Sequence, residues 1–529
     1  MKLGRTRSVA LSGVAGAMID VEAHVAQGLP ALAVTGLPDK ACAQAPDRIR
    51  SAAAAAGPGV PQSRVVVNLS PASLPKHGSA FDLPIAVAIL RAAGDVKTSL
   101  AERVVHLGEL GLDGAIRGVR GVLPCVMAAA RAGVTDVVVP VENVAEARLV
   151  DGVRVHAPST LAELLEWYAA NARSGVGLPL AAMSALGPER TERAKDLSDV
   201  VGQPEARIAL ELAAVGGHHM LLSGPPGVGK TMLAERLVTV LPPLDRALAL
   251  ESHAVRSLSG LEGVQALDCT PPFVAPHHTA STAAVVGGGS GLVLPGAISR
   301  AHGGVLFLDE APEFKTSVLQ TLRQPLESGE VTIARARESV TYPARFLLVL
   351  AANPCPCGMG WGRSTECSCG IPERRRYNAK LSGPLMDRID IRVTVPPVAR
   401  GAFGETSGES SAAVAERVAR AREAQRERWG NRLQSVARDG VAGPVAGGAA
   451  LALLNCQVPG HVLRRPPFRL GAAVLQPLEQ ALDYGEISLR GYDRSLRIAW
   501  SIADLAGRSS PTRDDVTIAL GFRARQVAA

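Results

Sequence analysis

One eight-residue segment constrains the fold of this chain more than any other feature. The segment Gly224-Pro-Pro-Gly-Val-Gly-Lys-Thr231 follows a short apolar run, residues 219–223, and precedes an expected helix, residues 232–240. This pattern is typical of a phosphate-binding loop between a buried strand and a helix. Its glycines let backbone N–H groups turn towards phosphate oxygens, Lys230 supplies a positive charge, and Thr231 offers its hydroxyl to Mg²⁺. We therefore predict that a nucleotide's phosphates and their Mg²⁺ bind to Gly224, Pro225, Pro226, Gly227, Val228, Gly229, Lys230 and Thr231.

Two further apolar runs end in polar side chains that would complete a nucleotide site. Residues 304–308 lead into Asp309 and Glu310. We expect Asp309 to join the magnesium shell and Glu310 to polarise the attacking water. Residues 345–351 lead into Asn353, an amide suited to holding that water or sensing the γ-phosphate. An asparagine before a proline is also ordinary turn chemistry, so the residues alone leave both interpretations open.

The length and the alternation of patterns predict several domains of α/β character. A chain of 529 residues exceeds what one hydrophobic core supports. The predicted units are residues 1–170, a linker of residues 171–195, a parallel-sheet α/β unit of residues 196–397 that includes the loop 355–369, and a helical region of residues 398–529. In the first unit we predict strands at residues 64–69 and 136–140 and helices at residues 83–93 and 122–132.

The chain shows neither a predicted membrane span nor a secretory signal. No apolar stretch is long enough to cross a bilayer, and no apolar core with a cleavage site follows the basic N-terminus. We therefore expect a cytoplasmic protein.

Four of the eight cysteines crowd into fifteen residues, spaced C-x-C-x₉-C-x-C. Cys355, Cys357, Cys367 and Cys369 could close a tetrahedral zinc site, although a spacing of one residue is tighter than usual. In a reducing compartment a metal site is a better interpretation than disulfides, and reduced thiols in a surface loop are the alternative. The basic residues 374–376 follow directly, and they would either contact DNA or simply be solvated on a helix.

Several long segments together resemble a known family. They are Ala275-Pro-His-His-Thr-Ala-Ser281, residues 305–310, Asn353-Pro-Cys-Pro-Cys-Gly358 and Leu381-Ser-Gly-Pro-Leu-Met-Asp-Arg-Ile-Asp390. They resemble the magnesium-chelatase-like AAA+ ATPases, and more narrowly the ComM/YifB branch, over almost the whole chain. The resemblance implies a P-loop αβα core with a helix-2 insert and a pre-sensor-1 hairpin, a C-terminal helical lid, and a ring, expected to be a hexamer, with ATP between subunits.

The resemblance also implies roles for residues outside the phosphate loop. Asn353 matches sensor 1, and Arg388 matches the arginine finger that reaches a neighbour's site, which is worth roughly 10³ to 10⁵ in rate. Without the family, Arg388 would be interpreted as a surface arginine paired with Asp387 or Asp390.

The C-terminal segment resembles the lid helix that carries sensor 2. Arg490 is our first choice for that residue and Arg497 the next. Trp500 stands where relatives usually carry arginine, so this segment departs from the family pattern.

Two insertions resemble those of the same clade. Residues 287–291, Gly-Gly-Gly-Ser-Gly, lie in the helix-2 insert, and residues 330–342 alternate as a β-hairpin does. If the hairpin projects into a ring's pore, Arg335 and Arg337 would meet a nucleic-acid backbone; a solvated hairpin is the alternative. The net charge of +7 favours a polyanionic partner, and 3% aromatic residues favour phosphate contacts over base stacking.

The N-terminal unit resembles the Lon-type, ribosomal-S5-like fold through residues 75–84 and 107–140. A peptidase of that class needs a serine nucleophile and a lysine base. Ala80 and Leu123 occupy those positions, although Ser79 and Lys76 lie nearby in the sequence. We therefore predict no peptidase activity.

The resemblance leaves three functions to distinguish. The first is an ATP-driven motor on branched or single-stranded DNA, with branch migration or helicase activity in recombination or natural transformation. The second is a magnesium-chelatase-like ATPase subunit that remodels a protein partner. The third, an ATP-dependent peptidase, is opposed by the missing dyad. The Lon-like domain and the cysteine loop favour the first.

Overall fold

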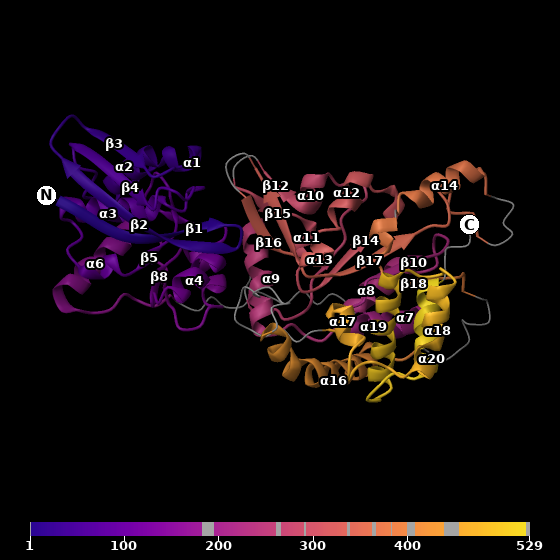
Figure 1. Cartoon of the computed structure of the whole chain (residues 1–529). Helices are drawn as coiled ribbons and strands as arrows, with labels where there is room; N and C mark the ends of the chain where they lie inside the picture. Colours follow the sequence, from indigo (N-terminus) through magenta and orange to yellow (C-terminus); the bar gives the residue numbers. More distant parts are fainter. Residues whose placement is uncertain are drawn as a thin grey trace.

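The computed structural model describes residues 2–181, 195–260, 266–289, 292–335, 339–361, 367–381, 383–398, 408–438 and 454–524. Figure 1 shows an N-terminal unit beside a central α/β core, with the C-terminal helices packed on one side of that core. Mixed α/β architecture with a parallel sheet confirms the predicted fold class at this level. In the described part of the chain, no helix combines the length and the apolar character needed to cross a membrane.

The N-terminal unit is built on a seven-stranded sheet of order β3-β4-β2-β1-β5-β8-β9. Its strands are β1 Lys2–Ser12, β2 Ala15–Ala26, β3 Ala31–Thr35, β4 Arg64–Ser70, β5 Val105–His106, β8 Asp136–Val138 and β9 Arg154–His156, with a separate pair β6 Glu109–Leu110 and β7 Ile116–Arg117. Its helices are α1 Lys40–Ala43, α2 Ala45–Ala55, α3 Asp82–Ala93, α4 Val122–Arg131, α5 Val144–Ala147 and α6 Leu161–Ser174, with the 3₁₀ turns η1 Ser99–Glu102 and η2 Val141–Asn143. The two strands and two helices predicted here are all present.

The predicted linker begins too early. Helix α6 continues to Ser174 and ends on Gly175 in the left-handed conformation. Its buried Leu161, Leu164 and Tyr168 anchor it to the N-terminal core, so packing overrides the polar composition of its last turn. Residues 182–194 of that linker lie outside the described residues.

The central core holds a five-stranded sheet of order β11-β14-β17-β10-β18, in which every neighbouring pair is parallel. Its strands are β10 Met220–Ser223, β11 Phe273–Val274, β14 Val305–Leu308, β17 Leu347–Ala352 and β18 Ile391–Thr394. The three runs predicted as strands are β10, β14 and β17, and all their residues are buried, as expected for a sheet covered on both faces.

Helices and two small insertions surround this sheet. The helices are α7 Pro204–Gly216, α8 Lys230–Val240, α9 Arg246–Ser259, α11 Ala297–Arg300, α12 Thr316–Thr321, α13 Pro325–Ser328, α14 Ile371–Ala379 and α15 Gly383–Met386, with the 3₁₀ turns η3 Leu197–Asp199 and η4 Ala311–Glu313. One insertion contains α10 Thr282–Val286, β12 Gly287–Gly288 and β13 Leu294–Pro295, and the other is the antiparallel pair β15 Glu330–Ala334 and β16 Ser339–Pro343. The hairpin predicted at residues 330–342 is therefore present.

The C-terminal region is helical in its described residues. It comprises α16 Ser411–Arg438, η6 Asn455–Gln457, α17 Gly460–Leu463, α18 Ala472–Asp483, α19 Leu489–Leu505 and α20 Arg513–Ala524. One continuous apolar cluster joins α16, α18, α19 and α20 to α7, α8 and one face of the central sheet. The other sheet face has its own cluster with α11, α12 and the β15–β16 hairpin. The C-terminal helices therefore pack on the sheet face that carries the phosphate-loop helix.

Candidate nucleotide site and cysteine cluster

The phosphate loop lies where the sequence predicts it, between β10 and α8. Gly227 and Gly229 adopt positive φ angles of 79° and 90°, which favour glycine. A Cβ on Gly224 would lie 2.2 Å from the backbone oxygen of Val395 at the end of β18, so only glycine fits there. Local glycine geometry thus opens the N-terminus of α8 towards an anion.

Lys230 is the centre of the loop's hydrogen bonding. Its Nζ donates to the backbone oxygens of Gly224 at 2.6 Å and Pro225 at 2.8 Å, and to Asn353 Oδ1 at 3.0 Å. Burial lowers the pKa of Lys230 below its ordinary value, and the nearby charges of Asp309 and Glu310 oppose that shift. The predicted lysine and the predicted sensor asparagine are therefore in direct contact.

The two predicted magnesium ligands also meet. Thr231 Oγ1 donates to Asp309 Oδ2 at 2.8 Å, across from the end of β14 to the first turn of α8. A hydroxyl and a carboxylate at this distance fit a hard cation that keeps several waters, as Mg²⁺ does. The donor set therefore suits the metal that accompanies a nucleoside triphosphate.

Glu310 follows Asp309 in a left-handed backbone conformation, with φ of 48°. Non-glycine residues at such angles are uncommon and concentrate at functional sites. Its backbone N–H donates to Asp309 Oδ1 at 2.9 Å, and one of its carboxylate oxygens lies 3.4 Å from His278 Nδ1. His278 lies in the family-like segment 275–281, and the structure places it against the predicted catalytic glutamate, a contact that the sequence did not indicate.

Arg388 is largely buried, with 8% exposure. Its guanidinium donates to the backbone oxygen of Pro384 and to the carboxylate of Glu327. The alternative pairing with Asp390 is not what the structure shows, because that carboxylate contacts Arg494 and His218. The role of Arg388 in a neighbouring subunit's site stays a prediction.

The C-terminal arginines occupy different environments on α19. Arg490 is exposed in the first turn, whereas Arg497 is partly buried and its Nε donates to the backbone oxygen of Val458 at 2.9 Å. Arg494, which sequence reasoning passed over, donates to the buried Asp390 and, at 3.0 Å, to the backbone oxygen of Arg388. Arg494 therefore joins α19 to the segment that carries Arg388. The one feature of the sequence that pointed to Arg494 was its position between Arg490 and Arg497.

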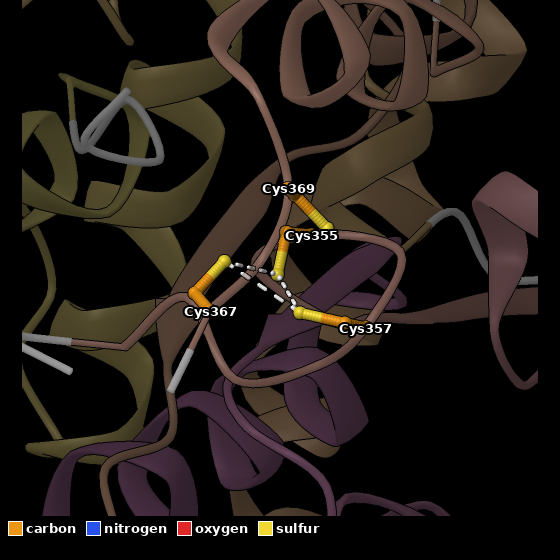
Figure 2. A group of neighbouring side chains, drawn as sticks. All are labelled: Cys355, Cys357, Cys367 and Cys369. Atoms are coloured by element: carbon orange, nitrogen blue, oxygen red, sulfur yellow. Dashed lines mark hydrogen bonds between the residues drawn. The ribbon is translucent and has the colours of Figure 1, made fainter. Parts of the chain in front are cut away.

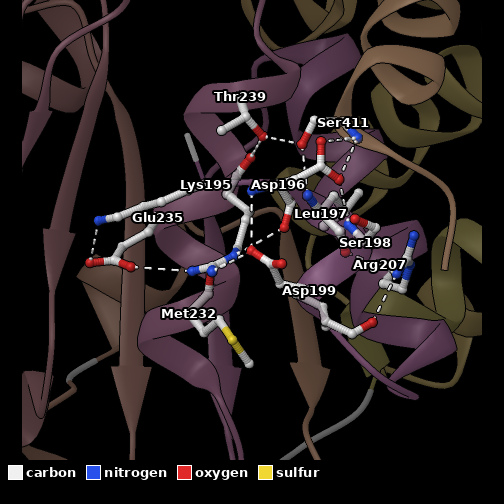
Figure 3. A network of polar contacts seen from close by, with 12 residues as sticks. Lys195, Asp196, Leu197, Ser198, Asp199, Arg207, Met232, Glu235, Thr239 and Ser411 are labelled. Carbon is white, nitrogen blue, oxygen red and sulfur yellow. Dashed lines mark hydrogen bonds and ion pairs between the residues drawn. The ribbon is translucent and has the colours of Figure 1, made fainter. Parts of the chain in front are cut away.

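A polar network joins the phosphate-loop helix to the start of the C-terminal helices (Figure 3). Ser411 Oγ accepts from the backbone N–H of Leu197 at 2.7 Å and lies 2.6 Å from Thr239 Oγ1 on α8. The carboxylate of Asp196 accepts from the backbone N–H of Ser411, and Arg236 on α8 donates to Asp199 at 2.9 Å. Helix α8 is thus tied to both η3 and the first residue of α16.

The four predicted cysteines are close enough to share one ion, with all sulfurs within 4.8 Å of one another (Figure 2). Sγ of Cys355 lies 3.3 Å from Cys357 and 3.6 Å from Cys367, and Cys357 and Cys367 are 3.5 Å apart. A tetrahedral zinc site with Zn–S bonds of about 2.3 Å requires sulfurs about 3.8 Å apart. The residues therefore fit a four-thiolate zinc site.

The two insertions of the core pack against each other. A Cβ on Gly287 would lie 2.7 Å from Ile333 Cδ1, and one on Gly289 would lie 3.8 Å from an Arg335 nitrogen. Arg335 stands at the end of β15, one residue past its last paired position. Arg337, the second predicted DNA contact, lies outside the described residues.

The N-terminal unit gives Ser79 and Lys76 separate partners. Ser79 Oγ donates to the carboxylate of Glu109, and the buried Lys76 Nζ donates to the backbone oxygen of Pro71. Ala80 precedes α3 and Leu123 is buried in α4. Ser79 and Lys76 are thus hydrogen-bonded to different partners, and the absence of peptidase activity stays a prediction.

Comparison with known proteins places this geometry in a family. Residues 196–403 match the model described as magnesium chelatase, subunit ChlI, residues 21–143 match that of subunit ChlI of Mg-chelatase, and residues 408–523 match that of the ChlI C-terminal region. An uncharacterized protein of Mycobacterium tuberculosis is 48% identical over 527 residues, covering 99% of both chains.

Two further relatives also match over nearly their full length. The protein YifB of Salmonella typhimurium is 39% identical over 99% of this chain and 97% of its own. The competence protein ComM of Haemophilus influenzae is 38% identical over 99% of this chain and 98% of its own. The chain therefore belongs to the ComM/YifB branch of the magnesium-chelatase-like ATPases.

Proposed function

We propose that this chain is an ATP-hydrolysing ring motor that moves DNA, with branch migration or helicase activity in recombination or natural transformation. The observation that carries the proposal is the side-by-side packing of the two insertions, with Arg335 at the end of β15. A relative 38% identical over nearly its whole length is named a competence protein, which supports a role in competence for this chain. A basic hairpin repeated around a ring would concentrate positive charge on a DNA backbone.

Five side chains of the nucleotide site would carry out ATP hydrolysis. Lys230 would hold the β and γ phosphates, and Thr231 with Asp309 would hold Mg²⁺, which neutralises charge developing on the phosphates. Glu310 would orient and polarise the water, and Asn353, already bonded to Lys230, would fix that water or the γ-phosphate.

Assembly into a ring, expected to be a hexamer, completes the proposal. Arg388 would leave Glu327 to reach the phosphates bound by a neighbour, and Arg490, exposed on α19, would act as sensor 2. The hydrogen bond from Arg494 to the Arg388 backbone supplies a route by which α19 positions the finger.

The cysteine cluster is proposed to hold a structural Zn²⁺. Four thiolates close the coordination shell, so the ion would stabilise the loop and take no part in the chemistry. Protein purified without chelators should contain one zinc per chain by metal analysis, and the Cys357→Ser variant should contain much less. Zinc-free, folded wild-type protein would reject this assignment.

A second function has its own support. The three matching family models are all described as magnesium-chelatase subunit models, including the one over residues 21–143. The alternative is therefore an ATPase subunit that remodels a protein partner.

DNA-stimulated ATPase activity separates the two functions. Branched or single-stranded DNA should bind and raise hydrolysis in the wild-type protein. The Arg335→Ala/Arg337→Ala variant should bind more weakly, and its binding should depend less steeply on salt. A matched control, Arg420→Ala/Arg426→Ala, removes two exposed arginines from α16. If DNA neither binds nor stimulates while a protein partner does, the motor proposal is wrong.

A further inference from the structure

The cysteine cluster adjoins the nucleotide site both along the chain and in space. Cys355 follows Asn353 by two residues, and Asn353 accepts the hydrogen bond from Lys230. Cys357 is followed by Gly358, where a Cβ would lie 2.9 Å from Pro226 Cδ in the phosphate loop. The segment carrying two of the cysteines therefore touches the phosphate loop at two points.

The other half of the cluster returns to the same asparagine. Cys367 and Cys369 lead into α14, whose buried Tyr377 has its pKa raised by burial and by Glu313, while an interaction of its hydroxyl with the nearby backbone of Asn353 opposes that rise. An ion on all four sulfurs would thus close a loop that begins at Asn353 and ends on Tyr377.

Polar donors next to the sulfurs suit a negatively charged thiolate site. Arg374 Nη2 donates to Cys367 Sγ at 3.2 Å, and the backbone N–H of Gly360 donates to Cys355 Sγ at 3.2 Å. Zn²⁺ with four thiolates has a net charge of −2, and such outer-shell donors orient the ligands and tune the site.

We propose that Zn²⁺ loading of this cluster and nucleotide binding at the phosphate loop are positively linked, because the ion holds Asn353 and Gly358 against Lys230 and Pro226. The inference rests on the proposed ATP and zinc sites. Without the ion, no metal bonds join Cys355 and Cys357 to Cys367 and Cys369, and nucleotide binding must then order the segment to a greater extent, which lowers affinity. Linkage is reciprocal, so zinc affinity must change by the same factor when nucleotide binds.

The test uses full-length, zinc-loaded protein and ADP with Mg²⁺ as the probe. Removal of zinc by a chelator, with the fold checked by circular dichroism, should weaken nucleotide binding in calorimetry by about 5- to 150-fold. Competition with a chromogenic chelator should show zinc binding tightened by the same factor at saturating ADP and Mg²⁺. Cys369→Ser should reproduce the loss, and Cys269→Ser, outside the cluster, should not.

Pro226→Ala addresses the contact itself. The substitution removes the ring atoms that Gly358 packs against. Zinc should still bind to this variant. Its nucleotide affinity, however, should be nearly the same with and without zinc, so that the ratio of the two affinities falls towards one. Equal nucleotide affinities in loaded and folded, stripped protein would overturn the inference while leaving both proposed sites intact. If removal of zinc unfolds the protein, the zinc-competition measurement decides. A zinc affinity that is the same with and without nucleotide overturns the linkage. Absence of zinc would instead reject the zinc site itself.

Discussion

Single residues at the ends of β10, β14 and β17 carry the proposed chemistry. Lys230, Thr231, Asp309 and Asn353 come from three parts of the chain, and their side chains are within hydrogen-bond distance in pairs. The carboxyl ends of parallel strands meet at one edge of a sheet, which is where such α/β proteins bind ligands.

Lys230→Ala should abolish nucleotide binding or turnover. The change removes the charge that contacts the phosphates and leaves Asn353 Oδ1 without this donor. Equilibrium binding of ADP with Mg²⁺ and steady-state hydrolysis measure the effect. Lys315→Ala, an exposed lysine before α12, should retain both, and normal turnover in Lys230→Ala would contradict the assignment.

Glu310→Gln should bind ATP normally but turn over about 10²- to 10⁴-fold more slowly, because the amide cannot polarise water. Binding and single-turnover hydrolysis separate the two steps. Glu313→Gln, an exposed acid in η4, is the control. Turnover within twofold of wild type would assign the water to another group.

At the scale of elements, the β1–β2 turn of the N-terminal unit rests on the β15–β16 hairpin. A Cβ on Gly13 would lie 2.6 Å from the backbone oxygen of Thr341 in β16, and Leu11 and Val14 pack on the hairpin's apolar cluster. The hairpin is therefore in direct contact with the N-terminal sheet.

Gly13→Val should lower the free energy of unfolding by about 1–3 kcal/mol more than the strain of placing a side chain at a positive φ, because the added side chain must displace β16. Gly59→Val is the matched control because Gly59 has a φ of 68°, close to the 64° of Gly13, and has open space around it. Thermal unfolding of both variants gives the difference. Equal losses would mean that the contact with Thr341 is unimportant.

Helix α19 is held to the core by a buried ion pair. Burial alone would raise the pKa of Asp390, but Arg494, followed by His218 and His219, outweighs it and leaves the pKa below its ordinary value. The stabilisation is therefore complete above the ordinary aspartate pKa and is lost only as the pH falls through the lower folded value.

Arg494→Ala should lower the free energy of unfolding by about 3–5 kcal/mol at neutral pH, because it leaves the buried carboxylate of Asp390 without its arginine partner. It should also move acid destabilisation to higher pH, since the pKa of Asp390 rises. Denaturant unfolding between pH 3 and 7 measures both, with Arg490→Ala as an exposed control on the same helix. A pH profile parallel to that of wild type would contradict the assigned pairing.

At the scale of the whole molecule, the proposed ring would divide the nucleotide site between subunits. Arg388→Ala should keep nucleotide binding and lose about 10³- to 10⁵-fold in hydrolysis. Mixing it with Lys230→Ala should restore part of the activity, because one variant supplies the phosphate loop and the other the arginine. If the two variants are shown to assemble together and hydrolysis is still absent, an arginine finger supplied by the neighbouring subunit is excluded.

The sequence by itself determined the phosphate loop, the acidic pair and the cysteine spacing, because each is a contiguous pattern whose chemistry follows from its neighbours. Only the tertiary structure decided the pairings of Lys230 with Asn353, Arg388 with Glu327, Arg494 with Asp390, and Gly358 with Pro226. Those partners lie 61 to 132 residues apart, from the differences 388 − 327 and 358 − 226. Lys230 and Asn353 meet because β10 lies between β17 and β18, and a strand order of this kind depends on packing of the whole sheet and not on a local pattern.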